Sequence, residues 1–559
     1  MTARKSRDTK SRLPEGSSSR HGESAPSTSS GHFPSSAAIR ETIESVVIAF
    51  ILAFLFRTFE AEAFIIPTGS MAPTLMGRHK DVECPKCGCP YRISSSSEVT
   101  AEGARIVVDG EPRSVTAGTC PMCRHTATEW GKAPSYNGDR ILVGKPRYQF
   151  SDPRRWDVIV FKFPGDGETD ARTNFIKRLI GLPGETVRIE NGDIWIRRPG
   201  GEPDEFHLER KPPGKLLAVL QPVFDNRYMP AIAELGWPER WRPEPTAAGE
   251  PGWTSDDRVA FRADGSAPGE NWLRYEHRIP SFRQWRRFLD TGRAEEAAPQ
   301  LITDFMAYDT GRFPNDDFRL RGLPSYPQPP ENSLGEHWVG DLVLCCTVEV
   351  LGESGELVLE LRKGGRQFQC RVDVATGRAT LAISGEDAAD FQPTAATGIR
   401  GPGRHELRYS NCDNQLLLWV DGRLVSFDAS TAYDERLRNH KAADGDLQPI
   451  GIASVGAALE ISDLNVMRDI YYIALKETPY REHAHVDFDL EEDQFFVLGD
   501  NSAFSKDSRL WGHDNHYVPR ELLIGKALFI YWPHSYDRIP YLDIPFPFFP
   551  NFKDMGFVR

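Results

Sequence analysis

The sequence FIIPTGSM occupies residues Phe64–Met71 of this 559-residue chain. It places Ser70 in a Thr-Gly-Ser turn directly after an apolar run that is typical of a strand. A serine hydroxyl acts as a nucleophile only when a neighbouring base takes its proton. No histidine and aspartate pattern of the triad kind accompanies Ser70, so a different base is needed.

A lysine about a hundred residues further along the chain is the candidate base. Lys177 follows the apolar pair Phe175 and Ile176 and precedes Arg178. A lysine can accept a proton near pH 7 when burial or a neighbouring cation lowers its pKa. Apolar walls would desolvate the Lys177 amine, and Arg178 would supply a cation. We therefore expect neutral Lys177 to take the proton of Ser70.

An apolar segment precedes this serine. Residues 46–56 carry no polar side chain, and the segment reaches 18 residues over Thr42–Phe59, within the roughly 17–25 residues of a spanning helix. The basic residues at the start of the chain all lie before it, which places the N-terminus in the cytoplasm by the positive-inside tendency. We expect a transmembrane helix over residues 38–60. A buried core helix and a cleavable signal peptide are the alternatives.

The composition limits the remaining classes of function. Residues 1–37 are rich in Ser, Gly, Pro and charge, which predicts disorder. The formal net charge is −13, although the first forty residues are basic, so the body of the chain is acidic. An acidic body argues against a nucleic-acid partner. The length suggests about two to four domains.

Four pieces of sequence follow the apolar segment in order. They are PTGSMAPTL (Pro67–Leu75), GDRILV (Gly138–Val143), KRLIGLPGE (Lys177–Glu185) and GDNSAFSKDSR (Gly499–Arg509). This series resembles the type I signal peptidases, which are membrane-bound Ser/Lys peptidases. The resemblance covers residues ~40–198 and ~470–545 and leaves out the long middle of the chain.

The resemblance implies a role for individual residues. Ser70 is then the nucleophile and Lys177 its general base, while the Thr68 hydroxyl helps the Ser70 backbone N–H to hold the oxyanion. Ser505 corresponds to the serine that orients the lysine by a hydrogen bond. The charged residues that brace the site through ion pairs are Arg178, Asp500, Asp507 and Arg509. The chain departs from the family at Ser502, Ala503 and Phe504, where many members carry Arg, Asp and Asn.

Two Cys-x-x-Cys pairs stand between the first two motifs. Cys84 and Cys87 are separated by 32 residues from Cys120 and Cys123, and Cys89 is a spare thiol. This spacing predicts a zinc ribbon with a closed, structural tetrathiolate site. The expected location across the membrane favours disulfides instead. Zinc, disulfides and free thiols therefore all stay open.

The middle of the chain predicts a β-sandwich. Strand-like runs occupy residues 342–350, 357–361, 368–374 and 379–383, and Asp421-Gly422 marks a hairpin. Short strands at this density are typical of sandwiches, and the pattern resembles concanavalin- and laminin-G-like domains. A carbohydrate or protein ligand would follow from that resemblance, and a passive structural insertion is the alternative.

The sequence as a whole predicts a mainly β peptidase split by two insertions. The expected parts are a disordered cytoplasmic tail (1–37), the transmembrane helix (38–60), a first catalytic part (61–198) with a Cys-rich ribbon insert (82–126), the sandwich insertion (199–470) and a second catalytic part (471–559).

The expected activity is cleavage of N-terminal signal peptides from exported preproteins. The enzyme would lie in the cell inner membrane, in contact with lipid, with its catalytic domain on the extracytoplasmic side and no cofactor needed for catalysis. The alternatives are a self-cleaving repressor-type Ser/Lys peptidase, a surface-displayed binding protein with a vestigial peptidase, and a zinc-dependent hydrolase.

Overall fold

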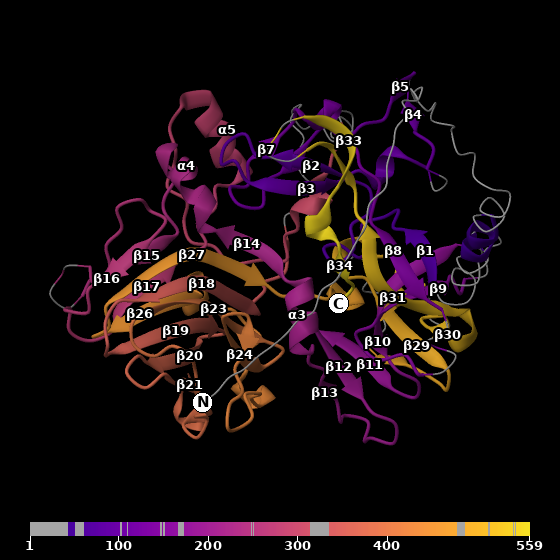
Figure 1. The fold of residues 1–559 in the computed structure, drawn as a ribbon. Coiled ribbons are helices and arrows are strands. Elements are labelled where there is room, and N and C mark those ends of the chain that lie inside the picture. The colour runs from indigo at the N-terminus through magenta and orange to yellow at the C-terminus, as the bar shows by residue number, and fades with distance from the viewer. Residues whose placement is uncertain are drawn as a thin grey trace, which may run out of the picture. The chain divides into compact units, whose positions relative to one another are not determined.

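A computed structural model describes residues 43–50 and most of residues 61–559. Within the second range the gaps are 101–102, 109, 146–147, 149–150, 166–172, 247–248, 250, 314–334, 478–486, 512–514, 540–541 and 543. The described structure is mainly β, as the sequence predicts, with several antiparallel sheets and only short helices (Figure 1).

An eight-stranded sheet brings the ends of the sequence together. Its order is β1-β8-β31-β9-β10-β29-β30, and β34 pairs with β31. The strands are β1 (Ala61–Ile65), β8 (Arg140–Gly144), β9 (Val158–Lys162), β10 (Asn174–Gly181), β29 (Gln494–Leu498), β30 (Val518–Pro519), β31 (Leu523–Trp532) and β34 (Gly556–Phe557). Because β10 pairs with β29 in this sheet, segments more than three hundred residues apart become neighbours.

A smaller sheet adjoins this one. It runs in the order β13-β12-β11-β28, and its strands are β11 (Thr186–Glu190), β12 (Asp193–Arg197), β13 (His207–Leu208) and β28 (Asp487–Asp489). The helix α3 (Pro213–Val219) follows it. Val219 packs in the core of this sheet, while Leu216 packs against β18 and β24 of the next region. The helix therefore joins the two parts of the structure (Figure 1).

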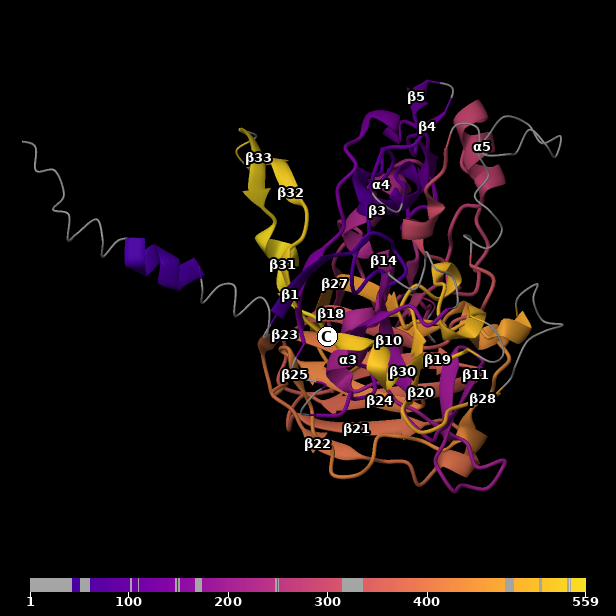
Figure 2. The same cartoon turned by 90° about the vertical axis from the view of Figure 1, so that its right-hand side faces the viewer.

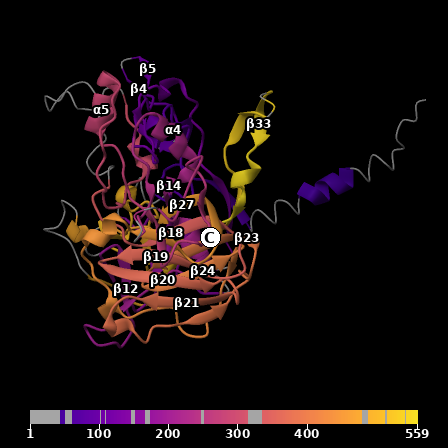
Figure 3. The ribbon, with the colours of Figure 1, turned by 90° about the vertical axis from the view of Figure 1, so that its left-hand side faces the viewer.

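Two seven-stranded sheets form a layered region over residues 221–468, which we call the two-sheet region (Figures 1 and 3). The first sheet contains β14 (Gln221–Asp225), β16 (Phe261–Ala263), β18 (Leu342–Val350), β23 (Gly403–Cys412), β24 (Gln415–Val420), β25 (Arg423–Leu424) and β27 (Leu459–Arg468). The second contains β15 (Trp241–Pro243), β17 (Asn271–Tyr275), β19 (Glu356–Lys363), β20 (Arg366–Asp373), β21 (Arg378–Ile383), β22 (Thr394–Ala396) and β26 (Ile450–Val455). Their inward side chains share one apolar cluster, which is what packing of two sheets face to face requires.

The local sequence explains the bounds of one of these strands and the position of one hairpin turn. The run 342–350 forms β18 with the bounds that its apolar pattern predicts. Asp421 and Gly422 both have positive φ, 51° and 75°, between β24 and β25. Two successive residues of this kind make the tight turn that matches the twist of a hairpin, so the predicted hairpin is present.

The cysteine-rich residues form three small hairpins. These are β2 (His79–Glu83) with β3 (Pro90–Ser94), β4 (Val107–Val108) with β5 (Glu111–Pro112), and β6 (Gly118–Thr119) with β7 (Thr126–Ala127). The helices α4 (Met229–Glu234) and α5 (Phe282–Thr291) pack beside them. The indole of Trp285 on α5 donates a hydrogen bond of 2.7 Å to the carbonyl of Cys123, which ties the cysteine-rich hairpins to the middle of the chain.

A last hairpin, β32 (Ser535–Arg538) with β33 (Pro545–Pro550), follows β31 and projects away from the sheets (Figure 2). The strand β33 contains Pro545, Pro547 and Pro550. It still pairs with β32, although the register shifts between Tyr536 and Arg538.

The predicted membrane segment overlaps the described residues only at 43–50, which are helical, and its remainder lies outside them. None of the helices among the described residues has the length and apolar character that crossing a bilayer requires.

Candidate active site

The side chains of the two residues proposed as nucleophile and base are in contact. Ser70 lies in the turn after β1, and Lys177 projects from β10. The Lys177 Nζ is 2.7 Å from the Ser70 Oγ and 2.9 Å from the Ile176 carbonyl. Ser70 is 8% exposed and Lys177 3% exposed. This is the distance and the shielding from water that a Ser/Lys pair needs for proton transfer.

Burial sets the protonation of Lys177. Loss of hydration lowers the pKa of Lys177 to about 8, with a smaller contribution from the cation Arg509. The carboxylates of Asp507 and Asp500 act in the opposite direction. The sequence analysis assigned the cationic part to Arg178, and the structure corrects this. Adjacent residues of a strand point to opposite faces, so Arg178 turns away from the amine and binds Asp500.

The Arg178 side chain forms a buried, two-pronged ion pair with Asp500. Its Nε and Nη2 each donate to one Asp500 oxygen at 2.6 Å, and its Nη1 donates to the Trp156 carbonyl at 2.9 Å. The Thr74 hydroxyl donates to the second Asp500 oxygen at 2.5 Å. The pair therefore clamps β10 to the loop after β29 and to the turn that carries Ser70.

A second ion pair braces the same loop. Arg509 Nε and Nη2 each donate to an Asp507 oxygen at 2.8 Å, and the Gly499 N–H donates to Asp507 at 3.0 Å. Arg509 Nη1 also donates to the Ser502 hydroxyl at 2.8 Å, and the Ile473 N–H donates to the same hydroxyl at 2.9 Å. Ser502, one of the departures from the family pattern, is thus part of this brace.

Thr68 and Ser505 are placed differently from each other. Thr68 is exposed on the turn before Ser70. Ser505 is buried, and among the described residues its hydroxyl has no hydrogen-bond partner. The predicted hydrogen bond from Ser505 to Lys177 is therefore not formed in this structure. The Ser505 Oγ does lie beside the turn that carries Ser70. A Cβ added to Gly499 would come within 2.2 Å of the Ser505 Oγ and within 2.4 Å of the Ser70 carbonyl oxygen.

Three residues of the site were missed by the sequence analysis. The Asn501 N–H donates to the Ser70 carbonyl at 3.1 Å, and its side-chain amide donates to the Gly69 carbonyl at 3.2 Å and to Asp309 at 2.7 Å. Burial raises the pKa of Asp309 to about 7. Tyr308 packs on the other side of the turn, where a Cβ on Gly69 would meet its ring at 2.1 Å.

Asp309 and Tyr308 come from the middle of the chain, which the sequence analysis treated as an insertion separate from the catalytic parts. They lie in the short 3-10 turn Ala307–Thr310. The only signal that pointed to Asn501 was its place inside the fourth motif. No signal in the sequence pointed to Asp309, because the contact joins residues 192 positions apart.

The four predicted zinc ligands also meet. The sulfur atoms of Cys84, Cys87, Cys120 and Cys123 all lie within 4.8 Å of one another, and all four residues are buried. Two of the sulfur pairs are 3.5 Å apart. A disulfide requires about 2.05 Å, whereas four thiolates at 2.3 Å from one tetrahedral zinc lie about 3.8 Å apart. The geometry fits a metal better than a disulfide.

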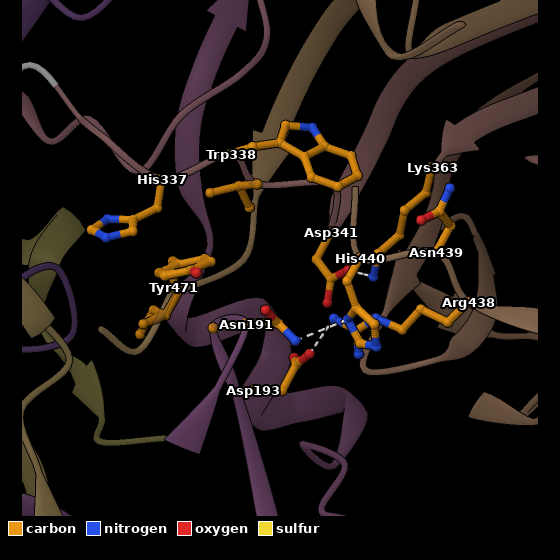
Figure 4. A pocket seen from close by; sticks show the side chains of 14 residues that line it. Asn191, Asp193, His337, Trp338, Asp341, Lys363, Arg438, Asn439, His440 and Tyr471 are labelled. Carbon is orange, nitrogen blue, oxygen red and sulfur yellow. Dashed lines mark hydrogen bonds and ion pairs between the residues drawn. The ribbon is translucent and has the colours of Figure 1, made fainter. Parts of the chain in front are cut away.

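A hollow of about 190 Å³ lies between the β11–β12 hairpin and the two-sheet region. Figure 4 shows the ion pair of Asp193 with Arg438 in its lining, and Lys363 paired to Asp341 beside them. The hollow shares Tyr471 and Ile470 with a smaller cavity that Asp309, Asp500 and Asn501 line. The two cavities are therefore neighbours that share these two residues.

Comparison with known proteins shows which family parts of this chain resemble. Residues 125–218 and 414–532 match the family model "Signal peptidase, peptidase S26". The chain is 29% identical to signal peptidase I of Leptolyngbya laminosa over 179 residues, which are 31% of this chain and 57% of that protein. It is 29% identical to the probable signal peptidase I-1 of Synechocystis over 198 residues, 34% of this chain and 69% of that protein.

Among solved structures, galectin LEC-6 of Caenorhabditis elegans overlaps 23% of this chain and 83% of its own, with 8% identity and a TM-score of 0.17. The sequence matches span little more than half of the first relative's length and about two thirds of the second's. The chain carries a peptidase S26 region and resembles the type I signal peptidases.

Proposed function

We propose that this relative of the type I signal peptidases is a membrane-anchored serine endopeptidase that removes N-terminal signal peptides from exported preproteins. The observation that carries the proposal is the buried contact of 2.7 Å between Ser70 Oγ and Lys177 Nζ. In this proposal residues 38–60 anchor the chain in the cell inner membrane and its lipid, with the catalytic part on the extracytoplasmic side. The acidic charge of the chain gives no support to a nucleic-acid partner.

The proposed reaction proceeds through an acyl-enzyme. Ser70 Oγ forms a bond to the scissile carbonyl carbon while its proton passes to neutral Lys177. The Ser70 backbone N–H and the Thr68 hydroxyl stabilise the oxyanion, each such donor being typically worth about 3–4 kcal/mol. The peptide C–N bond then breaks, and the leaving amine takes the proton from Lys177. Water, deprotonated by Lys177, cleaves the ester and releases the second product.

The substrate chain would lie extended along β1. Among the described strands β1 pairs only with β8, so its other edge can accept a peptide by main-chain hydrogen bonds. The Ile65 side chain on β1 is exposed and offers an apolar contact. Small side chains at an Ala-x-Ala junction, which mark the ends of signal peptides, would fit closely beside such a strand.

The test of the proposed function is cleavage of a model preprotein with an Ala-x-Ala junction by the full chain in detergent, followed by mass. We expect a single cut after the second alanine. A folded enzyme that leaves this substrate intact, or that cuts at many positions, would argue against the proposal.

The rate of cleavage should depend on pH through Lys177. Its pKa is lowered by burial to about 8, so the amine is protonated and inactive as a base below that pH and neutral above it. We expect kcat/KM to rise with pH and to level off above about pH 8, because this profile reports the free enzyme. Two substrates with different leaving groups should give the same midpoint. A midpoint near the ordinary lysine value of 10.5 would contradict the assignment.

The contacts of Asn501 should matter for the chemical step. Asn501→Ala removes the amide that holds Gly69 and Asp309, and Asp309→Ala removes the group that orients this amide. A displacement of the nucleophile by about 1 Å can cost on the order of 10²-fold, so we expect kcat to fall by that factor with little change in KM. Asn439→Ala, on a loop of the two-sheet region, is the control. If Asn501→Ala, Asp309→Ala and Asn439→Ala had equal kcat values, Asn501 and Asp309 would not position the nucleophile.

We propose a structural zinc ion at Cys84, Cys87, Cys120 and Cys123. The Cys84→Ser variant should bind one zinc ion less per chain than the wild type and should unfold at a lower temperature, because metal binding to such a site contributes to folding. Cys89→Ser is the matched control, since Cys89 is buried nearby but is not one of the four. Metal analysis and thermal unfolding measure both effects. Equal zinc content in the two variants would contradict the site.

A carbohydrate or protein ligand of the two-sheet region stays a second proposal. The feature that favours it is the hollow of Figure 4, where two nitrogens of the buried Arg438 side chain have no hydrogen-bond partner among the described residues. In the alternative of a surface-displayed binding protein, Ser70→Ala would leave the function in the cell intact, whereas a signal peptidase would lose it.

A further inference from the structure

Two histidines and an aspartate meet at the junction of the first cysteine-rich hairpin with the end of the eight-stranded sheet. His79 and Asp81 lie on β2 two positions apart, so their side chains share one face of the strand. His534 comes two residues after β31 ends. One ligand atom from each of these side chains lies within 4.8 Å of the other two. The cysteine cluster uses none of these three residues.

The histidines are buried, but no hydrogen bond accounts for their inward nitrogens. His79 is 1% exposed and His534 2% exposed. Among the described residues, His79 Nε2 and both ring nitrogens of His534 lack a partner aligned for a hydrogen bond. His534 Nε2 lies 2.8 Å and His79 Nε2 3.5 Å from the two Asp81 oxygens. Buried nitrogens of this kind normally have a partner, so their arrangement calls for one.

The surroundings orient these groups as metal ligands are oriented. His79 Nδ1 is 2.7 Å from the Gly77 carbonyl. This contact requires the proton on Nδ1 and leaves a lone pair on Nε2, which lies 3.5 Å from Asp81. A histidine that donates from one ring nitrogen and keeps a lone pair on the other is common at metal sites. Arg92 Nε donates to Asp81 Oδ1 at 3.0 Å, which leaves Oδ2 available, and Arg92 also pairs with Asp554, which offsets its charge.

We propose that His79, Asp81 and His534 form a second divalent-cation site, of the nitrogen and oxygen type that Zn²⁺ accepts. Ligand atoms at about 2.05 Å from a tetrahedral zinc are separated by about 3.3 Å. His534 Nε2 lies 2.8 Å from Asp81 Oδ2, and the three ligand atoms all lie within 4.8 Å of one another. Asp81 is 36% exposed, so its side of the site is open to solvent. Three protein ligands leave a fourth position for water.

The cation would fasten the C-terminal part of the chain to the first cysteine-rich hairpin. β2 leads directly into Cys84, and His534 leads directly into the β32–β33 hairpin. Protein contacts already join the same two parts, since Arg92 of β3 binds Asp554. Tyr136, whose backbone pairs with that of His79, also has its ring 4.5 Å from that of His534. A metal bond between β2 and the end of β31 would add a link that depends on the ion.

The experiment compares bound zinc per chain in the full protein, purified in detergent and dialysed against buffered Zn²⁺. Asp81→Ala and His534→Gln should each bind one zinc ion less than the wild type. Zinc at the cysteine site contributes equally to the wild type and to these variants, so it cancels in the comparison. Asp554→Asn is the matched control, since it touches Arg92 but supplies no ligand, and it should keep the wild-type zinc content. Circular dichroism verifies that each variant is folded.

A second measurement separates the two sites. Co²⁺ bound to the Cys84→Ser variant should show absorption of nitrogen and oxygen ligands only, and the further change Asp81→Ala should remove it. Equal metal content in the wild type and the folded Asp81→Ala variant would overturn the proposal. So would the absence of cobalt from Cys84→Ser, and in both cases the His534–Asp81 contact would be a plain ion pair.

Discussion

Replacing Ser70 by alanine should lower kcat for preprotein cleavage by about 10⁶-fold, the loss expected when a nucleophile that acts together with its base is removed. Lys177→Met should cost a similar factor, because without a base the hydroxyl keeps its proton. The Lys177 amine lies 2.7 Å from the Ser70 hydroxyl, so the two residues act on one proton. The double variant should therefore be no slower than either single variant.

The measurement is the rate of cleavage at the Ala-x-Ala junction, in single turnover, for the three variants and the wild type. Lys162→Met is the matched control: Lys162 is an exposed lysine on the neighbouring strand β9, and its removal should leave the rate unchanged. If Lys177→Met kept more than about a hundredth of the wild-type rate, another group would have to be the base, since loss of a general base typically costs at least about 10²-fold.

Replacing Asp500 by alanine should destabilise the protein by about 3–5 kcal/mol, the cost of leaving one member of a buried ion pair alone. Asp500 accepts both Arg178 bonds at 2.6 Å, and both side chains are almost completely buried. The variant leaves the Arg178 guanidinium without its carboxylate. It also frees the Thr74 hydroxyl, so the turn that carries Ser70 should loosen and activity should fall with stability.

Urea unfolding measures the loss of stability. The matched control is Asp493→Asn, which removes the charge of an exposed pair with Arg520 and keeps a residue that tolerates the positive φ of this position. Pairs at the surface typically contribute about 0–1 kcal/mol, so this variant should unfold close to the wild type. Similar losses for Asp500→Ala and Asp493→Asn would mean that the Arg178 pair contributes no more than a surface contact.

The sequence was most informative where chemistry requires particular residues at a fixed place along the chain. Ser70 and Lys177 could be selected because each follows an apolar strand and belongs to an ordered series of motifs. The four zinc-ligand candidates could be selected because a Cys-x-x-Cys pair brings two thiolates to one side of a tight turn. The hairpin at Asp421 and Gly422 followed from residues that tolerate positive φ.

The sequence was least informative about contacts between segments that are distant along the chain. Asp309 and Tyr308 carry no motif, and nothing local distinguishes them from other residues of the middle region. Arg178 was expected to act on Lys177 because it is adjacent in the sequence. On a strand that adjacency places the two side chains on opposite faces, so the partner of Arg178 is Asp500 instead.

By itself the sequence determined the mainly β character, the resemblance to the signal peptidases and the identity of the candidate nucleophile and base, because strand patterns and reactive residues are local properties. Only the tertiary structure decided what surrounds them. The pairing of β10 with β29 brings Asp500 and Asn501 to the Ser70 turn, and the packing of Ala307–Thr310 adds Asp309. The pKa of Lys177 also depends on this packing, because the desolvation that lowers it comes from all the segments that bury the amine.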